Sequence, residues 1–174
     1  MSKGLAAPLV TGSALAVDPG EVHCGMAHWY QRNANPTLPL WRCEWAKEVG
    51  QDECVDSIAD VVREPADLWD YDVILLEGFW LKPGIDALRQ AGSQLETVQV
   101  IGAIRHLCRR SGMPLVLVAN GQDGIRRKLK SKGYKFSAHG HGDHAHDAEA
   151  IGYRGLELKV QNLEQLHGRT RALP

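Results

Sequence analysis

Two short apolar runs in the sequence each lead into an acidic residue that is followed by turn-forming residues. Residues 15–17 (Leu-Ala-Val) precede Asp18, and residues 73–76 (Val-Ile-Leu-Leu) precede Glu77. Runs of this length and composition predict buried strands. An ionised carboxylate at the end of a buried strand is costly unless a metal or a basic partner meets it. Both acids are therefore candidate functional residues, although the Asp-Pro-Gly after the first run is also ordinary turn chemistry.

The segment between these two strands has the periodicity of an amphipathic helix. Its apolar residues follow the spacing i, i+1, i+4, i+7 and i+8, at Cys54, Val55, Ile58, Val61 and Val62. Asp52 is predicted to cap this helix, and Pro65 is predicted to end it. A helix between two strands indicates a crossover between parallel neighbours, whose carboxyl ends lie at one edge of the sheet. We therefore expect Asp18 and Glu77 to converge at that edge, where open α/β sheets place their sites.

The remaining elements complete a predicted α/β fold. Further strands are expected at residues 24–30, 40–45 and 113–119, and a long helix at 93–110. The strand at 24–30 follows the first too closely for a crossover, so the two should pair antiparallel. The prediction is a five-stranded mixed sheet, with the first three strands antiparallel and the rest parallel, flanked by helices. We expect one domain over residues 1–174, with a core at about 14–157 and loose ends at 1–13 and 161–174.

The composition is that of an ordinary globular chain. The sequence is 44% apolar and 24% charged, and no apolar run approaches membrane-spanning length. Its four cysteines, Cys24, Cys43, Cys54 and Cys108, form no C-x-x-C pair and no disulfide-framework spacing. We therefore expect buried free thiols in a reducing cytoplasm.

The net charge of −1 does not indicate a nucleic-acid-binding protein, but the distribution of charge does. Between positions 126 and 135 every charged residue is basic: Arg126, Arg127, Lys128, Lys130, Lys132 and Lys135. Clustered Lys and Arg residues gain affinity for a polyanion by releasing its counterions. The segment is therefore either a phosphate-binding surface or a solvated basic face. Tyr134 and Phe136 beside it could add contacts with bases or sugars.

The last element with candidate chemistry is rich in histidine. Glycines interrupt residues 139–142, and from Asp143 onward the residues favour a helix, with Asp143 near its cap. His144, Asp147 and Ile151 are spaced i, i+3 and i+7, so they share one face. If Ile151 anchors that face on the core, His144 and Asp147 point toward the sheet edge that carries the two acids.

The grouped acids and histidine predict a metal site of one of two kinds. Asp18, Glu77, Asp147 and His144 form an oxygen-rich set that suits Mg²⁺ or Mn²⁺. Two such ions about 4 Å apart can activate a water and stabilise the leaving oxygen in phosphodiester cleavage. The alternative is zinc, because His139-x-His141-x-Asp143-His144 matches the H-x-H-x-D-H signature of the metallo-β-lactamase family of hydrolases. That alternative leaves Asp18 and Glu77 without a role, and little chain follows His144 to supply further ligands.

The motifs together resemble the RuvC-type Holliday-junction resolvases of the RNase H-like nuclease superfamily. The resemblance rests on Asp18-Pro-Gly, on Glu77 and on residues 144–151 (His-Ala-His-Asp-Ala-Glu-Ala-Ile), and it covers about residues 14–157. It implies an RNase H-like fold, a homodimer and Mg²⁺-dependent paired nicking of four-way DNA junctions, with Mn²⁺ able to substitute. We expect the dimer to form through the helix at 93–110, whose apolar residues cover more than one stripe; a helix that is simply well buried would show the same pattern. Divergent members occur in phages, so the expected location is the cytoplasm, that of the bacterial host for a phage protein.

The resemblance also implies roles for individual residues. The family holds two metal ions with acids at the positions of Asp18, Glu77 and Asp147, and with Asp or His at the position of His144; Asp143 could serve in its place. Trp80 matches an aromatic residue thought to stack at the opened junction. Candidate phosphate contacts are Arg126, Arg127, Lys128 and Lys130. A non-catalytic dimer that only binds branched DNA is the other alternative, although binding alone gains nothing from carboxylates that repel one another.

Overall fold

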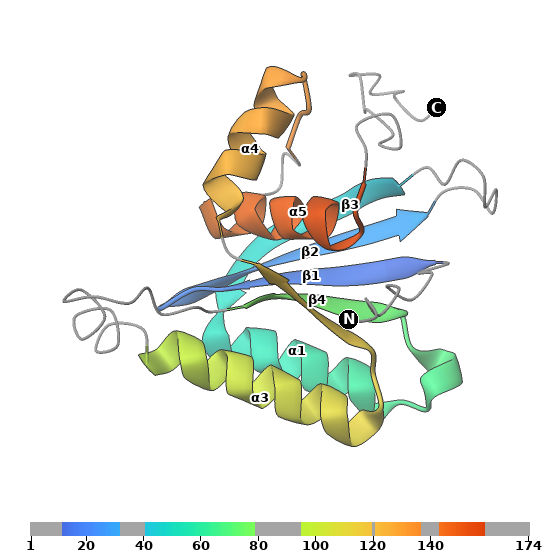
Figure 1. Ribbon diagram of the computed structural model, residues 1–174. Coiled ribbons are helices and arrows are strands. Elements are labelled where there is room, and N and C mark those ends of the chain that lie inside the picture. Colours follow the sequence, from blue (N-terminus) through green and yellow to red (C-terminus); the bar gives the residue numbers. More distant parts are fainter. Residues whose placement is uncertain (1–11, 32–40, 79–94, 120, 137–142, 159–174) are drawn as a thin grey trace, which may run out of the picture.

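A computed structural model of the chain describes residues 12–31, 41–78, 95–119, 121–136 and 143–158 (Figure 1). Its centre is a five-stranded sheet with the strand order β3-β2-β1-β4-β5. The strands are β1 (Ser13–Pro19), β2 (His23–Gln31), β3 (Trp41–Gly50), β4 (Val73–Gly78) and β5 (Leu115–Ala119). The helices are α1 (Gln51–Arg63), the short 3-10 helix η1 (Ala66–Leu68), α3 (Leu95–Ser111), α4 (Gln122–Ser131) and α5 (Asp143–Gly155).

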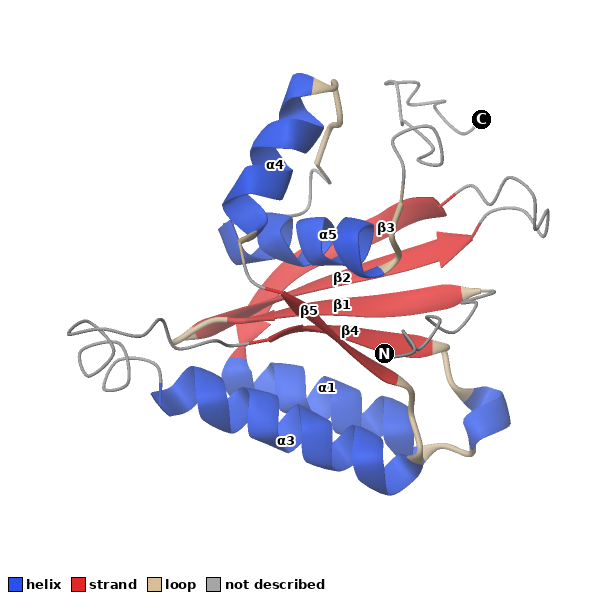
Figure 2. Ribbon diagram, in the orientation of Figure 1, coloured by secondary structure: helices blue, strands red, loops and turns tan. Residues whose placement is uncertain are grey.

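The pairing of the strands confirms the predicted mixed sheet. β1 pairs antiparallel with β2, and β2 pairs antiparallel with β3. β4 lies parallel to both β1 and β5. The helices form two layers, with α4 and α5 over one face of the sheet and α1 and α3 over the other (Figure 2).

Alternation along β1 and β4 divides their side chains between two cores. One core includes residues of α5 and takes Ala14, Ala16, Val73 and Leu75 from the two strands. The other includes residues of α1 and α3 and takes Leu15, Val17, Ile74 and Leu76. Because successive side chains of a strand point to opposite faces, Asp18 and Glu77 continue the row that faces α5.

The core under α5 is rich in small side chains. Ala16 of β1, Ala27 of β2 and Ala46 of β3 are fully buried there, and so are Ala145 and Ala148 of α5. Small side chains on both surfaces let a helix lie close to the sheet. The first turn of α5 is thereby held near the ends of β1 and β4, and Ile151 is fully buried as the sequence predicts.

Three elements differ from their sequence predictions. β3 continues beyond residue 45 because its pairing with β2 extends to Gly50 opposite His23. The prediction that Asp52 caps α1 is wrong: Gly50 is the N-cap and makes no side-chain cap bond, while Asp52 lies in the first turn, where a carboxylate still favours the helix dipole. The basic segment, for which no helix is predicted from the sequence, forms most of α4.

Other predictions hold within the described residues. α1 ends at Arg63, directly before the Glu64-Pro65 pair. All four cysteines are buried and free, as expected for thiols that pack in a core. None of the helices in the described ranges is both long and apolar enough to span a bilayer. The loose ends stay a prediction, because they fall almost entirely outside the described residues.

Candidate active site

The two strand-end acids lie side by side. Val17 of β1 pairs with Leu76 of β4 in parallel register, so the next residues, Asp18 and Glu77, are neighbours on the face toward α5. Asp18 is buried, with 5% of its surface exposed. Burial raises the pKa of Glu77 to about 8, and a hydrogen bond with Asp18 and the charge of Asp18 act in the same direction. Glu77 therefore keeps its proton near neutral pH unless a cation replaces it.

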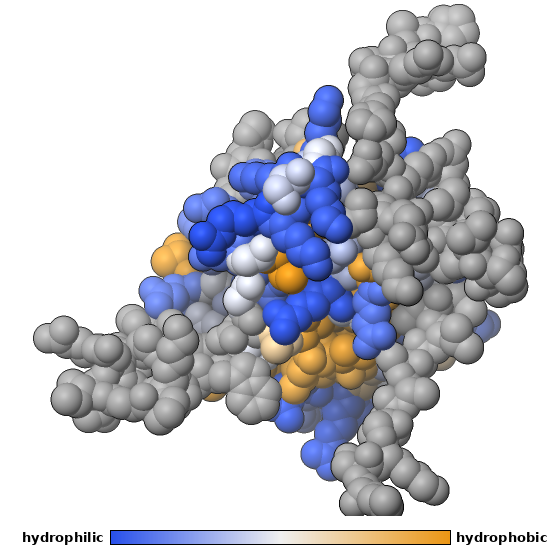
Figure 3. Space-filling model, turned by 45° about the horizontal axis from the view of Figure 1, so that its top comes forward, coloured by the Kyte–Doolittle hydropathy of each residue, from blue (hydrophilic) through white to orange (hydrophobic). Residues whose placement is uncertain are grey.

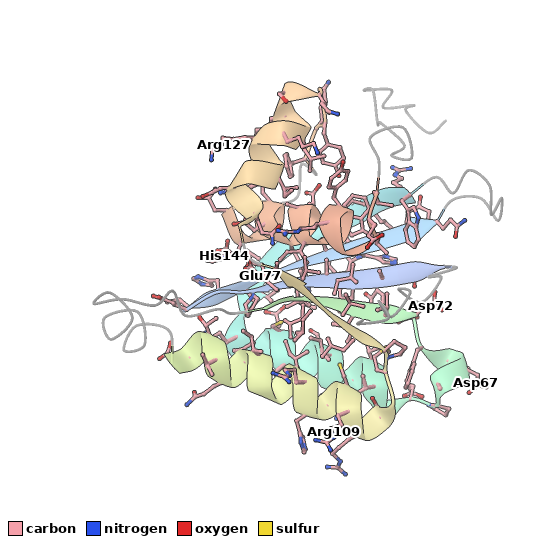
Figure 4. All side chains as sticks on the ribbon, in the orientation of Figure 1. Asp67, Asp72, Glu77, Arg109, Arg127 and His144 are labelled. Atoms are coloured by element: carbon pink, nitrogen blue, oxygen red, sulfur yellow. The ribbon has the colours of Figure 1, made fainter. Side chains whose placement is uncertain are left out.

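His144, from the first turn of α5, contacts one member of this pair, Asp18. Its Nδ1 lies 2.7 Å from Oδ2 of Asp18. This hydrogen bond raises the pKa of His144 to about 9, and the charges of Asp18, Glu48 and Asp147 add to the rise although partial burial opposes it. Glu77 and His144 lie together at one end of the sheet (Figure 4).

Two glycines make room for His144. A Cβ atom on Gly20, in the turn after β1, would lie 2.5 Å from Cε1 of the His144 ring. A Cβ atom on Gly25 of β2 would overlap the backbone carbonyl of His144. Asp18 pairs with Gly25 across the β1–β2 ladder, so the absence of a side chain at Gly25 lets α5 begin directly above Asp18.

Asp147, one turn further along α5, lies against a basic side chain. Nε of Arg126 is 3.0 Å from Oδ1 of Asp147. This oxygen is nevertheless buried without a hydrogen bond, so the contact is an ion pair in which the N–H does not point at the oxygen. Burial raises the pKa of Asp147 to about 6, the charge of Asp18 adds to the rise, and Arg126 opposes it.

Arg126 pairs with two further acids. Its Nη1 lies 3.0 Å from Oδ1 of Asp143, and its Nη2 contacts Oδ1 of Asp123 one turn earlier on α4. Only 17% of the Arg126 side chain is exposed, whereas 88% of the Asp143 side chain is. Asp143 is therefore exposed and paired with Arg126, and of the two candidates for the fourth ligand His144 is the one that contacts Asp18.

Gln122 belongs to the site although the sequence analysis did not single it out. It is the first residue of α4, and only 4% of its surface is exposed. Its side-chain amide donates hydrogen bonds to Oε1 of Glu77 at 3.2 Å and to the carbonyl of Ala119 at 3.0 Å. Gln122 and Arg126 are spaced i, i+4, so they lie on one face of α4. From that face Gln122 contacts Glu77 and Arg126 contacts Asp147. The sequence shows this spacing, but i and i+4 residues share a face only in a helix, and no helix is predicted there.

A hollow opens beside the acids at this end of the sheet. It has a volume of about 530 Å³. The described residues that line it come from the end of β1 and the following turn, the end of β4, α3 and α5: Asp18, Pro19, Gly20, Glu21, Val22, His23, Glu77, Gly78, Thr97, Ile101 and His144. The acid pair and His144 are therefore accessible from outside.

The donor set fits a hard divalent cation in chemical type. Three carboxylates and one imidazole suit Mg²⁺ or Mn²⁺, and the buried Oδ1 of Asp147 accepts no hydrogen bond, so it can act as a metal ligand. In the part of the chain that the structure describes, however, no three His, Cys, Asp or Glu side chains gather closely enough to hold one ion. His144 is paired with Asp18, and Asp147 is paired with Arg126.

The basic residues of α4 beyond Arg126 lie on the surface. Arg127, Lys128 and Lys130 are exposed, and Arg127 extends away from the helix (Figure 4). Hydrophilic side chains gather on the face where α4 comes forward (Figure 3). Nζ of Lys130 lies 5.8 Å from the ring centre of Phe136, and that ring is 5.0 Å from the ring of His146 on α5. A basic surface with adjoining aromatic rings thus adjoins the acidic site.

Three candidate residues cannot be placed. Trp80, His139 and His141 lie outside the described residues. The two described members of the zinc motif point apart, because Asp143 pairs with Arg126 and His144 pairs with Asp18.

Comparisons with known proteins identify the fold. No protein-family model and no curated protein sequence matches the chain. Among solved structures it is similar to T. thermophilus RuvC in complex with a Holliday junction substrate, with 16% identity over 80% of this chain and 89% of that chain and a TM-score of 0.50. It is also similar to the fowlpox virus Holliday junction resolvase, with 15% identity over 83% of this chain and 97% of that chain and a TM-score of 0.49. The similarity to RuvC, with the mixed sheet and its helices, shows that the chain has a RuvC-like fold of the RNase H-like class.

Proposed function

We propose that the protein is a metal-dependent endonuclease that resolves four-way DNA junctions by paired nicking. The observation that carries the proposal is the pairing of Asp18 and Glu77 at the ends of adjacent parallel strands, with His144 against them. A buried carboxylate beside a half-buried one costs folding free energy, because burial and mutual repulsion both oppose ionisation. A protein that only binds DNA would gain nothing from grouped carboxylates, whereas a cation site needs them as ligands.

Four residues are proposed to hold two Mg²⁺ ions: Asp18, Glu77, His144 and Asp147. Bound there, the ions would supply an activated water and stabilise the departing oxygen of a cleaved phosphodiester. The protein contributes orientation. The amide of Gln122 fixes one oxygen of Glu77, and the hydrogen bond to Asp18 fixes the ring of His144. A fixed donor geometry lowers the cost of ordering the site when substrate arrives.

The DNA is proposed to lie across the exposed face of α4. Arg127, Lys128 and Lys130 are exposed there, on the helix whose first residue, Gln122, contacts Glu77. A DNA backbone bound to these basic residues would lead toward the hollow beside Asp18. Arg126 differs from them, because its guanidinium already faces three carboxylates. Trp80 is proposed to stack on a base at the opened junction.

Paired nicking needs two sites, and the proposal therefore includes a homodimer through α3. The inner side of this helix is used within the chain, where Val100, Ile101 and Ile104 are buried. Val98 on the same helix is 45% exposed and is available to a second copy. Light scattering of the purified protein would give the mass of the assembly, and Val98→Glu should shift a dimer toward monomer.

Two alternative functions make different predictions for a DNA-cleavage assay. A zinc hydrolase of the metallo-β-lactamase type would require that family's fold, and the fold here is RNase H-like. A dimer that binds branched DNA without cutting it would share the fold and the basic surface. Cleavage therefore distinguishes it from the proposed nuclease.

The test is a gel assay on a synthetic four-way junction and a matched linear duplex, with Mg²⁺, Mn²⁺, Zn²⁺ or EDTA. Asp18→Asn removes the ligand charge, and Asp67→Asn, in η1 far from the site and exposed, is the matched control (Figure 4). Symmetric nicks in the junction that need Mg²⁺ or Mn²⁺, survive Asp67→Asn and fall at least about 100-fold in Asp18→Asn would support the proposal.

Other outcomes would contradict parts of it. Cutting of forks and flaps as readily as junctions would make the protein a general debranching nuclease. Binding without cutting under every metal condition would favour the non-catalytic dimer. Activity only with Zn²⁺ would support a zinc site that includes His139 and His141 instead.

A further inference from the structure

Arg126 occupies a position unlike that of any other basic residue in the described part of α4. Its guanidinium contacts Asp123 on its own helix and both Asp143 and Asp147 on α5. Its side chain is largely buried, whereas Arg127, Lys128 and Lys130 are exposed. A guanidinium presents donors in a rigid fork, so it can engage carboxylates on several sides at once.

The contact with Asp147 differs from the other two. Asp123 and Asp143 accept hydrogen bonds from the terminal nitrogens of Arg126, and both acids are exposed. Asp147 is only 20% exposed at its side chain, and its Oδ1 faces Nε without a hydrogen bond. The attraction at Asp147 is therefore mainly one of charge, and a cation with higher charge density could replace it.

The same oxygen is a proposed metal donor. One carboxylate oxygen cannot be in contact with a guanidinium nitrogen at 3.0 Å and also be a ligand of a divalent cation on the same side. Repulsion between two positive charges at that separation would exclude one of them. The pairing with Arg126 also agrees with the finding that no three ligand-type side chains converge in the described residues.

We propose that Arg126 is a positioning residue that competes with a divalent cation for Asp147: it holds the carboxylate before the cation binds and releases it when the cation is bound. This inference rests on the proposed metal-dependent function, and it goes beyond it by giving the site a built-in competitor. The tethers to Asp123 and Asp143 keep the released guanidinium at the rim of the site. There it would face an incoming phosphate together with the exposed basic residues of α4.

A purely structural role for Arg126 makes the opposite prediction. Arg126 links α4 to α5, and just after α4 the Tyr134 hydroxyl donates a hydrogen bond to Oε2 of Glu149 on α5 at 3.0 Å. If Arg126 only fixed α5 in place, its removal would misplace Asp147 and weaken metal binding. If it competes with the cation, its removal strengthens metal binding.

The test is calorimetric titration of Mn²⁺ into the DNA-free full chain at neutral pH. The variants are Arg126→Gln, Arg126→Lys and the control Arg63→Gln, which removes an exposed arginine that pairs with Asp60 at 2.9 Å remote from the site. We expect Arg126→Gln to bind Mn²⁺ about tenfold more tightly than wild type, and Arg63→Gln to bind as wild type does. Arg126→Lys retains the charge without the fork, so its affinity should lie between those of Arg126→Gln and wild type.

Each result decides between the two roles. Equal or weaker Mn²⁺ affinity in a folded Arg126→Gln variant would overturn the proposal. If that variant does not fold, Arg126→Lys carries the test, and an affinity no higher than that of wild type would overturn it. Mn²⁺ binding by wild type that disappears in Asp18→Asn would leave the proposed function standing in either case. Failure of every variant to bind Mn²⁺ would overturn both.

Discussion

Nδ1 of His144 lies 2.7 Å from Oδ2 of Asp18, and this contact joins residues that are 126 positions apart in the sequence. It brings α5 against the end of β1 and makes the protonation of the imidazole depend on Asp18. The pKa of His144 rises to about 9 because its charged form donates a hydrogen bond to Asp18. In the metal-free protein the imidazole is thus mainly protonated at neutral pH.

The first prediction concerns the titration of His144. In protein treated with EDTA, the NMR signal of its ring should titrate near pH 9, well above the ordinary value of 6.5. The hydrogen bond stabilises the folded state fully below the ordinary pKa, and this contribution is lost as the pH rises through the folded pKa. Asp18→Asn should move the titration toward the ordinary range. An unchanged midpoint in that variant would show that Asp18 is not the cause.

The second prediction concerns the pH dependence of stability through Glu77. Its pKa of about 8 exceeds the ordinary 4.5, so the unfolded chain gives up this proton at lower pH than the folded protein does. The contribution of Glu77 to the free energy of unfolding is therefore fully present below its ordinary pKa and is lost as the pH rises through its folded pKa. Metal-free wild type should therefore lose roughly 1–3 kcal/mol of unfolding free energy from Glu77 between about pH 5 and about pH 8. Urea denaturation at each pH measures this change.

The variant Glu77→Gln removes the ionisable group and should flatten that part of the pH dependence. The matched control is Glu96→Gln on the exposed surface of α3, which should keep the wild-type dependence. Mg²⁺ should stabilise wild type most at the upper end of the pH range, because binding of a cation favours the ionised carboxyl. An equally steep loss of stability in Glu77→Gln would assign the pH dependence to another group.

The third prediction concerns the basic surface of α4. The double change of Arg127 and Lys130 to alanine should weaken junction binding and lower the slope of log affinity against log salt by about 0.9 for each phosphate that is no longer neutralised. Arg63→Ala is the control, because Arg63 is exposed at the end of α1 on the opposite side of the sheet from α4 (Figure 2). Fluorescence anisotropy over a range of salt concentrations measures both slopes. An unchanged slope in the double variant would identify the surface as solvated only.

The fourth prediction concerns the close approach of α5 to β2 at Gly25. A Cβ atom there would overlap the backbone of His144, so Gly25→Ala should destabilise the fold by at least about 2 kcal/mol and weaken Mn²⁺ binding. Gly124→Ala is the matched control: it lies in α4, and a Cβ atom there would meet nothing within 4 Å. That change should stabilise the helix by about 0.5–1 kcal/mol. Equal stability of the two variants would mean that α5 is free to shift.

Much of the fold could be predicted from local pattern. Buried strands that end in Asp18 and Glu77, with a helical segment between them, indicate parallel neighbours, and β1 and β4 are adjacent and parallel. Period-two alternation then assigns both acids to one face. The spacing of His144, Asp147 and Ile151 likewise places the imidazole and the carboxylate above that face, because Ile151 is the apolar anchor.

The missed parts of the site depend on contacts between elements. Gln122 contacts Glu77 because the chain turns sharply at Gly121, where φ is 104°, and begins α4 beside the end of β4. The sequence predicts the same phosphate-binding role for Arg126 as for its basic neighbours, because charge can be read from a sequence and surroundings cannot. Its surroundings are three carboxylates, two of them from α5.

Local sequence pattern thus accounts for the sheet, the facing of its acids and the helix that carries His144 and Asp147. These depend on periodicity and burial, which are properties of short segments. The choice of His144 over Asp143 as the partner of Asp18, and the pairing of Arg126 with Asp147, arise only when the elements pack together. The reason is physical: such pairings are set by the distance at which α4 and α5 pack on the sheet. That distance depends on small residues contributed by several separate strands and by α5, Gly25 among them, which no single segment of the sequence contains.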